Sequence, residues 1–347
     1  MRYLLNKIGS GCLVLAGVII LIFSLFILFP SAEEIAVGQR ADEKTRAAMR
    51  AEMGLDLPKG QQFALYLKDL SPIIVTRQVN PAYRGVTLNI GAYKLMMKAP
   101  YLRKSYQSKK YVYDILKEAF IGSFVLSVFA MGIALVLGVV SGVLSALKPG
   151  SVLDKSCLAL ATFGISLPSF FVAVIIAWLF GFVWSEYTGL SMSGSLFAIN
   201  PGTGENELAL RHLILPGIAL GIRPYSIIMQ LTRSNLIDVL QQDYIRTARA
   251  KGLSNFRVIW NHALRNALNP VVTAASGWFA SLLAGAFFVE YVFNWKGLGK
   301  VTIDALQQSD LPVVMGAVML VSFIFILINV LVDVIYVLLD PRVKLSA

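Results

Sequence analysis

Six apolar runs dominate the sequence, and each is long enough to cross a bilayer as a helix. A helix needs about 20 predominantly apolar residues to span the hydrocarbon core of a membrane. We therefore expect an all-α membrane protein with six transmembrane helices. The predicted spans are Gly11–Phe29, Phe120–Leu147, Leu153–Trp184, Ile214–Leu231, Val271–Val289 and Val313–Leu339.

The composition agrees with this fold class. Charged residues make up 15% of the 347 residues and hydrophobic residues 56%, whereas soluble domains carry roughly 25% charged and 45–50% apolar residues. In a soluble protein the formal net charge of +11 would suggest a nucleic-acid partner. Here the basic residues lie largely in loops between apolar runs, so membrane lipid is the expected partner and nucleic acid is not.

The first run begins after a short basic segment and is expected to stay in the mature protein. It exceeds the usual signal-peptide core of about 7–15 residues, and Pro30-Ser31-Ala32-Glu33 matches a cleavage site poorly. A cleaved signal peptide is the alternative. Residues 1–30 are thus predicted as a first transmembrane helix with a short cytoplasmic N-terminus, and the Lys/Arg surplus in short loops places both termini in the cytoplasm.

The long polar segment 31–111 is predicted as an extracytoplasmic loop or subdomain inserted after the first helix. Short amphipathic helices are expected over Thr45–Leu55 and Gly60–Leu70, whereas Gly85–Tyr106 shows no clear period. Residues 112–347 contain the remaining five runs. Within them Pro168 predicts a kink in the third span, and Pro216 and Pro224 predict similar breaks in the fourth.

A basic, helix-forming segment runs from Asp243 to Pro270 between the fourth and fifth spans, which argues for a cytoplasmic loop. Asp243–Lys251 reads as a short helix whose end charges suit the helix dipole, and Gly252 suits the left-handed turn after it. The small residues Ala248 and Ala250 are expected to allow close approach to a partner. With a second helix over Phe256–Leu268, the loop is predicted to be a rigid docking lever; a basic loop held on anionic lipid is the alternative.

No catalytic residue and no metal site is expected. A phosphate-binding loop is missing, since Gly299-Lys300 is followed by Val301. Gly164-Ile165-Ser166 lacks the second glycine of a nucleophile elbow. His212 and His262 fall on opposite predicted sides of the membrane, so they cannot share a zinc ion. The chain is therefore expected to be no enzyme and to bind no cofactor itself.

An ordered series of motifs resembles the dipeptide/oligopeptide/nickel branch of the ABC importer permeases. Arg246-Thr247-Ala248, with Gly252 after three further residues, occupies the place of the family's E-A-A-x-x-x-G loop. The resemblance covers roughly residues 1–29 and 112–344. Its other motifs are Ser166-Leu167-Pro168-Ser169-Phe170, His212-Leu213-Ile214-Leu215-Pro216, Leu231-Thr232-Arg233-Ser234, Phe293-Asn294-Trp295 with Gly297-Leu298-Gly299, and Leu339-Asp340-Pro341-Arg342.

The sequence also departs from the branch. Arg246 stands where the loop's first Glu is usual, Pro30-Ser31-Ala32-Glu33 replaces Pro-Gly-Asp-Pro, and Phe120-Ile121 replaces Leu-Pro. The outer loop carries an insertion near Val79–Pro100. The branch commonly tolerates the change at Arg246. The other departures lie on the outer side, so they concern the substrate and the delivering protein and not the coupling machinery.

The resemblance implies the type I ABC importer permease fold, with a core permease domain over 112–347 and a coupling loop over 234–270. It implies a multi-pass subunit of the bacterial inner membrane that forms half of a pathway for small peptides, or for related nickel or peptide-like solutes. The implied partners are a second homologous permease, two ATPase subunits that bind ATP and Mg, and an extracytoplasmic substrate-binding protein. The implied ATPase-coupling residues are Asp243, Tyr244, Arg246, Thr247, Ala248, Arg249, Ala250, Lys251 and Gly252.

Arg223 and Pro168 are the candidate residues of the substrate pathway. Arg223 precedes Arg233 by ten positions, so it lies some 15 Å deep, near the membrane midplane. A charge at that depth usually faces a cavity or a partner, and one hypothesis is that it meets a substrate carboxylate. The alternatives are pairing with the partner permease, or a shift of the span at Pro224. For Pro168 the alternative is helix shaping without substrate contact.

The alternative function is an ATPase-independent channel, or a membrane receptor with a basic cytoplasmic docking loop. A channel would need a ring of pore charges or a repeated filter. A receptor would need a cytoplasmic signalling domain. Neither feature is visible in the sequence.

Overall fold

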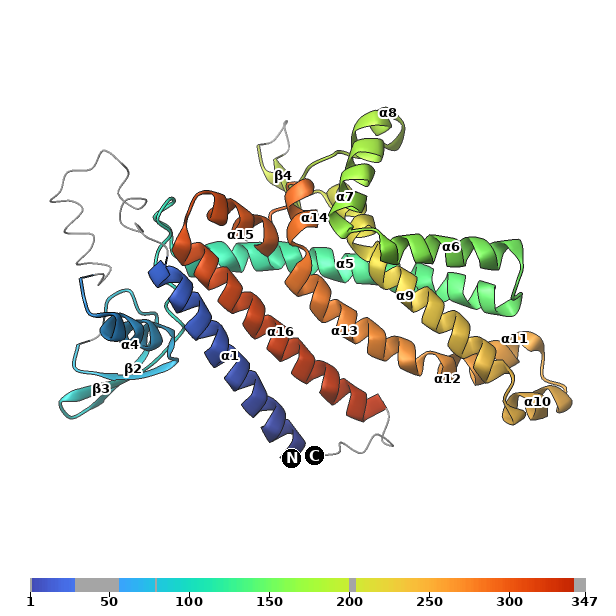
Figure 1. Ribbon diagram of the computed structural model, residues 1–347, viewed down its shortest axis with the longest axis horizontal. Coiled ribbons are helices and arrows are strands. Elements are labelled where there is room, and N and C mark those ends of the chain that lie inside the picture. The colour runs from blue at the N-terminus through green and yellow to red at the C-terminus, as the bar shows by residue number, and fades with distance from the viewer. Residues whose placement is uncertain (1, 29–55, 79, 200–203, 340–347) are drawn as a thin grey trace. The chain divides into compact units, whose positions relative to one another are not determined.

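The structure is a computed structural model that describes residues 2–28, 56–78, 80–199 and 204–339 (Figure 1). These residues form two compact units, which are described separately. The larger unit is built on Phe120–Lys300, and the smaller on Leu13–Ala119 and Val301–Leu320. Both consist mostly of helices.

The described α-helices are α1 (Arg2–Leu28), α4 (Lys59–Leu70), α5 (Val112–Leu147), α6 (Val152–Ser166), α7 (Ser169–Trp178), α8 (Ser185–Thr188), α9 (Ile214–Leu240), α10 (Asp243–Ala250), α11 (Asn255–Arg257), α12 (Arg265–Ala267), α13 (Asn269–Gly285), α14 (Phe287–Val292), α15 (Leu298–Gln307) and α16 (Leu311–Leu339). Two π-helical segments, η1 (Leu179–Val183) and η3 (Val258–Leu264), and one 3-10 turn, η2 (Leu210–Leu213), connect them. The strands are β1 (Ile73–Thr76), β2 (Gly85–Ile90), β3 (Tyr93–Lys98), β4 (Phe197–Ile199) and β5 (Asn206–Leu208).

Over the part of the chain that the structure describes, every predicted span coincides with a helix or a run of helices, but their lengths differ. Within the described residues, Val112–Leu147, Leu210–Leu240 and Leu311–Val332 are long and apolar enough to cross a membrane. The pair Val152–Ser166 and Ser169–Val183 makes a fourth crossing if it is one broken span. The mostly helical membrane fold is thus supported, and the count of six spans stays a prediction.

The third predicted span is bent far more sharply than a kink. Helix α6 and the following helical run meet at 111°, where Leu167 is extended (ψ 137°) and Pro168 begins the next segment. Proline disfavours the helical region for the residue before it, which explains the break. The predicted breaks in the fourth span are wrong. Helix α9 runs without interruption because Pro216 lies in its first turn, where proline is tolerated, and it continues through Pro224.

The core of the larger unit lies where α5, α7, α9 and α13 meet. Small residues let α5 and α9 approach closely. A side chain at Gly138 would collide with Ile228, and one at Gly142 would collide with the backbone of Met229. The fully or nearly fully buried residues at this junction include Leu126, Ala130, Ala134, Ala173, Ile228, Val271 and Trp295.

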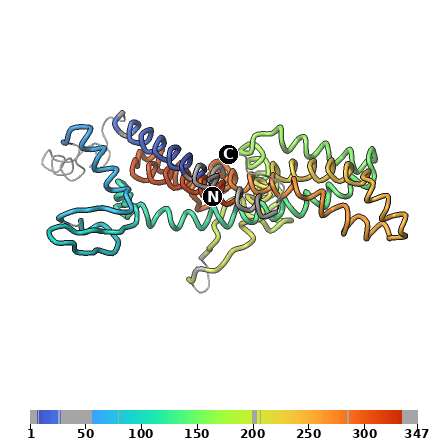
Figure 2. The backbone as a smooth tube through the Cα atoms, turned by 90° about the horizontal axis from the view of Figure 1, so that it is seen from below, coloured from blue at the N-terminus to red at the C-terminus, as the bar shows by residue number. Residues whose placement is uncertain are grey.

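The smaller unit contains the sheet that the all-α expectation missed. Its strands are antiparallel in the order β1-β3-β2, and Met97 of β3 lies opposite both Ile73 and Val86. The two-residue turn Gly91-Ala92 joins β2 to β3, and Gly91 adopts φ +60° there, which suits a tight hairpin. The tube view shows this hairpin, and also the separate hairpin of β4 and β5 in the larger unit (Figure 2).

Helix α4 confirms the predicted helix over Gly60–Leu70, whereas Thr45–Leu55 lies outside the described residues. Phe63 and Tyr66 of α4 pack on Phe23 of α1, with ring centroids 4.9 and 5.9 Å away. Ile22 and Leu70 complete this buried cluster. The subdomain after the first predicted span is therefore joined to that span by aromatic packing.

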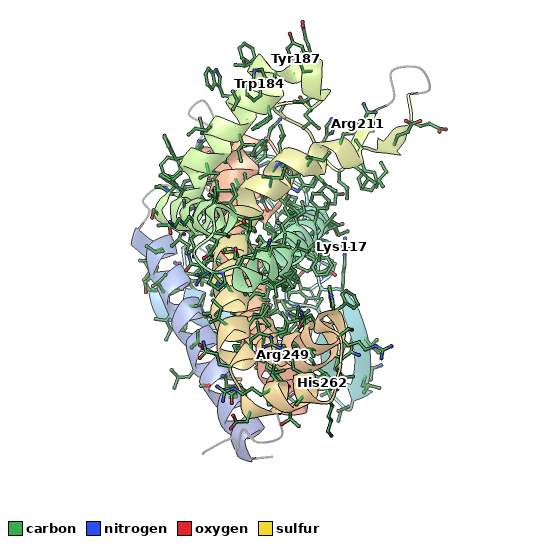
Figure 3. All side chains as sticks on the ribbon, turned by 90° about the vertical axis from the view of Figure 1, so that its right-hand side faces the viewer. Lys117, Trp184, Tyr187, Arg211, Arg249 and His262 are labelled. Atoms are coloured by element: carbon green, nitrogen blue, oxygen red, sulfur yellow. The ribbon has the colours of Figure 1, made fainter. Side chains whose placement is uncertain are left out.

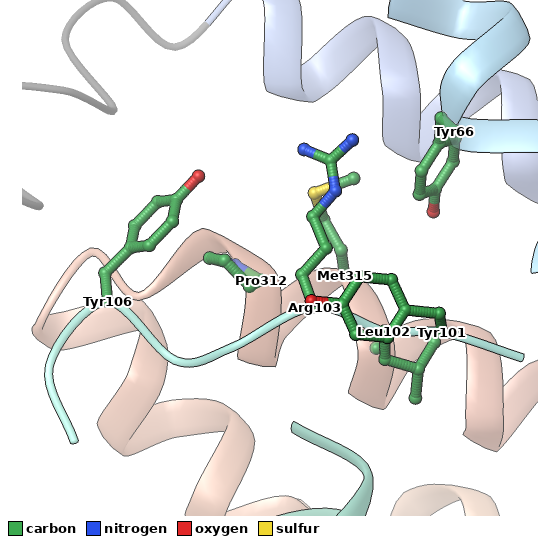
Figure 4. A pocket seen from close by; sticks show the side chains of 8 residues that line it. Tyr66, Tyr101, Leu102, Arg103, Tyr106, Pro312 and Met315 are labelled. Carbon is green, nitrogen blue, oxygen red and sulfur yellow. The ribbon is translucent and has the colours of Figure 1, made fainter. Parts of the chain in front are cut away.

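A small pocket lies between α4, residues 101–106 and the start of α16 (Figure 4). Arg103 lies between Tyr66 and Tyr106 in this view, and its Nε is 3.3 Å from the carboxylate of Asp69. Burial raises the pKa of Tyr66 and of Tyr106 to about 12. Both phenols thus stay neutral at physiological pH, and Arg103 is the charged group of the pocket wall.

Candidate functional site

The basic loop folds as a helix-turn-helix at the end of α9 (Figure 1). Gln242 is extended (ψ 149°) and separates α9 from α10. After α10, Gly252 adopts φ +79°, and its N–H donates to the carbonyl of Arg249 at 2.9 Å. Left-handed backbone of this kind favours glycine. The predicted helix and its glycine turn are therefore confirmed as local structure.

Helix α10 is amphipathic, and its apolar side is buried in the chain itself. Ile245 is fully buried and Ala248 is 7% exposed. They pack with Ala146 of α5, Leu236 of α9 and Val258 of η3, and this cluster also includes Ala263 and Ala267. The expectation that Ala248 faces a partner is wrong, because Ala248 shares a helix face with Ile245 three residues earlier. Ala250 is exposed.

The opposite side of α10 is polar and open to solvent. Its exposed residues are Asp243, Arg246, Thr247, Arg249, Ala250, Lys251 and Gly252. Arg246 is 3.5 Å from the carboxylate of Asp243, with both side chains largely exposed, so this ion pair contributes little. Three cations therefore remain presented on a helix that is fixed from behind.

Tyr244 connects α10 to the second helical arm of the loop. Its hydroxyl accepts a hydrogen bond from the side-chain amide of Asn266 at 2.9 Å. Thr247 donates to the backbone carbonyl of Asp243 at 3.0 Å. The Tyr244–Asn266 contact and the buried cluster therefore join α10 to the second helical arm, and the rigidity of the loop stays a prediction.

Sequence reasoning missed an exposed aromatic pair beside the cations. Phe256 and Trp260 are 69% and 52% exposed, and their ring centroids are 5.9 Å apart. The signal was present, because aromatic residues one helical turn apart in a basic segment share a face. Aromatic residues and arginine are enriched in protein interfaces.

Figure 3 shows Arg249 and His262 at one end of the larger unit in that view, and Trp184, Tyr187 and Arg211 at the other.

A buried ion pair that the sequence did not reveal lies close to this loop. The guanidinium of Arg233 on α9 donates to both carboxylate oxygens of Asp154 on α6, at 2.6 and 2.8 Å. The side chains are 22% and 2% exposed. Asp154 also accepts from the N–H of Gly150 at 2.8 Å. The start of α6 is thus tied to the end of α9 that carries α10.

The Phe293–Gly299 motif is also an internal structure. Glu290 is fully buried and accepts hydrogen bonds from the Ser123 hydroxyl and from the N–H groups of Gly299 and Lys300. It therefore caps the first turn of α15. A side chain at Gly297 would meet the Glu290 carboxylate. Trp295, also fully buried, donates its indole N–H to the carbonyl of Gly122 at 3.0 Å.

The two residues predicted to line the substrate pathway, Arg223 and Pro168, lie at different elements, α9 and the start of α7, and both are exposed. Arg223 is exposed on α9, and no hydrogen bond or ion pair joins it to another described residue. Pro168 is exposed at the bend between α6 and α7. A role for either residue in substrate passage stays a prediction. The described residues contain no group of three His, Cys, Asp or Glu side chains that could hold a metal ion.

Comparison with known proteins identifies the family. The family "Binding-protein-dependent transport system inner membrane component" matches residues 134–345, and the corresponding N-terminal family matches residues 1–127. The chain is 35% identical to the dipeptide transport system permease protein DppB of Escherichia coli K12, over 99% of both chains. It is 34% identical to the di/tripeptide permease protein DppB of Pseudomonas aeruginosa, over 99% of both chains. It is also 34% identical to DppB of Bacillus subtilis 168, over 99% of this chain and 98% of that one. The chain therefore belongs to the binding-protein-dependent transport system inner membrane components, in the peptide branch of the ABC importer permeases.

Proposed function

We propose that this chain is a permease subunit of an ATP-driven importer and forms half of the translocation pathway for small peptides or related peptide-like solutes. A second homologous permease would supply the other half. Two ATPase subunits would bind ATP and Mg, and an extracytoplasmic binding protein would deliver the substrate. Support comes from relatives named as dipeptide permeases that align with nearly the whole chain.

The surface of α10 carries the second half of the proposal, which is coupling to the ATPases. A helix that presents Arg246, Arg249 and Lys251 to the cytosol while Ile245 and Ala248 fix it from behind can transmit force. The exposed Phe256 and Trp260 extend this surface with apolar area. Arginines next to aromatic rings are typical of interface residues that carry most of the binding energy.

Movement of α10 would reach the membrane helices through two contacts. The cluster around Ile245 includes Leu236 of α9 and Ala146 of α5. The pair of Arg233 and Asp154 then links α9 to α6. Closure of the ATPases on ATP would thus shift a connected group of helices between two arrangements, and nucleotide would bias that equilibrium.

The test is reconstitution of the chain with its partner subunits and the binding protein. Arg249→Glu should reduce both copurification of the ATPase chains and peptide-stimulated ATP hydrolysis by about tenfold or more, because a contact worth about 1.4 kcal/mol is lost. Arg211→Glu, a charge reversal at another exposed arginine, should leave ATPase association unchanged. Full association and stimulation with Arg249→Glu would refute the coupling surface. Purification as a lone homo-oligomer would favour the channel or receptor instead.

A further inference from the structure

The outer face of the β1-β3-β2 sheet is apolar and uncovered by other described residues. The strand register places eight side chains on this face, which we call the outer sheet face: Ile73, Val75, Val86, Leu88, Ile90, Tyr93, Leu95 and Met97. Seven of them are between 46% and 73% exposed, and Leu95 is half-buried. Contiguous exposed apolar patches of this kind mark interaction sites for a protein or a membrane.

The other face of the same sheet is buried in part against the rest of the smaller unit. Ile74 and Met96 are 5% and 2% exposed. The amine of Lys98 donates to the backbone carbonyl of Asp69 on α4 and lies 4.5 Å from the ring centroid of Tyr83. Burial lowers the pKa of this amine. The outer sheet face is therefore not part of the unit's own core.

The packing of α4 on α1 fixes where the sheet lies along the length of the predicted first span. Phe63 and Tyr66 contact α1 around Ile22 and Phe23, well before α1 ends at Leu28. On the same turns of α1, Ile20, Leu21 and Leu25 are about half exposed or more (56%, 57% and 48%), as residues facing lipid should be. Helix α4 thus lies beside the outer part of a span, and it holds the sheet close to the membrane.

The segment around the sheet has a surplus of basic residues, which favours anionic lipid, and three of them (Lys98, Arg84 and Arg103) also have partners within the unit. Residues 73–113 contain eight basic residues and no acidic one: Arg77, Arg84, Lys94, Lys98, Arg103, Lys104, Lys109 and Lys110. Arg77 lies at the end of β1, donates to the hydroxyl of Tyr93 at 3.1 Å and lies over its ring at 5.1 Å. Tyrosine and arginine side chains of this kind are typical of the membrane–water interface.

The outer sheet face has almost no polar atoms, and this favours lipid over a protein partner. Tyr93 is the only one of its eight side chains with a polar atom, and it stands at the hairpin end. Protein interfaces carry about one hydrogen bond per 100–200 Å², whereas acyl chains need none. An aliphatic face with a tyrosine and a cation at its rim matches an interfacial membrane element.

We propose that the outer sheet face is embedded at the headgroup–acyl boundary of the extracytoplasmic leaflet, with Arg77 contacting lipid phosphate. The sheet would then attach the smaller unit to the membrane independently of the spans. Because the inference rests on burial and charge of this unit alone, it stands whether or not the coupling surface on α10 is correct.

The test uses the assembled transporter in nanodiscs that contain phosphatidylglycerol. In a Cys12→Ser, Cys157→Ser background, spin labels are placed by Val86→Cys and Leu88→Cys on the outer sheet face. Thr87→Cys, on the other face of the same strand and also exposed, is the matched control. Leu21→Cys on α1 is the reference for lipid. Collision rates with oxygen and with a water-soluble nickel chelate are compared, since oxygen partitions into lipid and the chelate does not.

Labels at residues 86 and 88 should collide several-fold more with oxygen than with the chelate, as at residue 21, and residue 87 should show the reverse. Protection from both reagents would mean that a protein partner or residues 29–55 cover the face, and would overturn the proposal. Water-like accessibility at residues 86 and 88 would overturn it too. Arg77→Glu should raise chelate access at residue 86 with phosphatidylglycerol and not with phosphatidylcholine; an equal change in both lipids would refute the phosphate contact.

Discussion

Helix α10 and the β1-β3-β2 sheet are both basic and both lie outside the predicted spans, yet they place their apolar residues on opposite sides. In α10, Ile245 and Ala248 point into the chain and the cations point outward. In the sheet, Val86 and Leu88 point outward at 73% and 59% exposure. A cationic surface with its apolar side hidden suits a partner in water, and an aliphatic surface with cations at its rim suits lipid.

The two regions also differ in how their charges are anchored. The loop that carries α10 is backed by Arg233 and Asp154, a pair with 22% and 2% exposed side chains. In the unit that contains the sheet, the ion pair of Arg84 with Asp114 is 61% and 45% exposed, and that of Arg103 with Asp69 is 28% and 13% exposed. Buried pairs fail badly when one partner is lost, whereas exposed pairs contribute little. The proposed coupling surface is therefore backed by the most buried of these three pairs.

The largest expected loss of stability comes from introducing an aspartate at an apolar position in each region. Ile245→Asp removes a fully buried side chain and places an unpaired charge in its cluster, which should cost about 4 kcal/mol or more of local stability. Hydrogen exchange should show α10 amides unprotected, and the ATPases should dissociate. Val86→Asp removes no contact from the chain's own buried clusters and should leave the hydrogen exchange of α10 unchanged. Protection of α10 in the Ile245→Asp variant would contradict its burial as an anchor.

A smaller effect is expected from breaking one ion pair in each region. Asp154→Asn leaves Arg233 partly buried without its charge partner and should lower the unfolding free energy by about 3 kcal/mol. Asp114→Asn should cost less than about 1 kcal/mol. Thermal unfolding in detergent measures both. The double variant Asp154→Leu, Arg233→Met should recover much of the loss, and an equal loss in the two single variants would remove the distinction between the regions.

The smallest expected loss of stability comes from replacing one left-handed glycine in each region. This comparison shows whether backbone strain alone lowers ATP hydrolysis. Gly252 and Gly91 adopt φ +79° and +60°, and neither has an atom within 4 Å of where a side chain would begin. Alanine at either position should therefore cost about 1 kcal/mol of conformational strain. Only Gly252→Ala should lower peptide-stimulated ATP hydrolysis, and Gly252→Asn, which tolerates this conformation, should restore it. A loss of stimulation with Gly91→Ala would show that the assay reports general instability.

Local signals in the sequence were sufficient for part of this structure. The proline at 168, the glycine at 252 and the dipole charges of α10 each act within a few residues, and the structure agrees on the break, the turn and the helix. Ala248 was misjudged because a small residue fits either a partner or a core. Its spacing of three from Ile245 was the better guide to its face.

Other features needed information that a single segment does not hold. In β2 the alternation of Val86, Leu88 and Ile90 with polar residues was a strand signal, but the buried Met96 interrupts the same pattern in β3. Glu290 reads as the first residue of an outer loop, and only the folded chain brings Ser123 and the start of α15 around it. Asp154 and Arg233 are 79 positions apart, so no periodicity could join them.

That separation has a consequence for the making of the protein. The ribosome adds about 5–20 residues per second, so Arg233 is synthesised roughly 4 to 16 s after Asp154, given the 79 positions between them. During that interval α6 carries a carboxylate whose partner does not yet exist. Until α9 is made, Asp154 on α6 therefore has to stay in contact with water or with the insertion machinery. The start of α6 can reach its final packing only after the fourth predicted span has been synthesised.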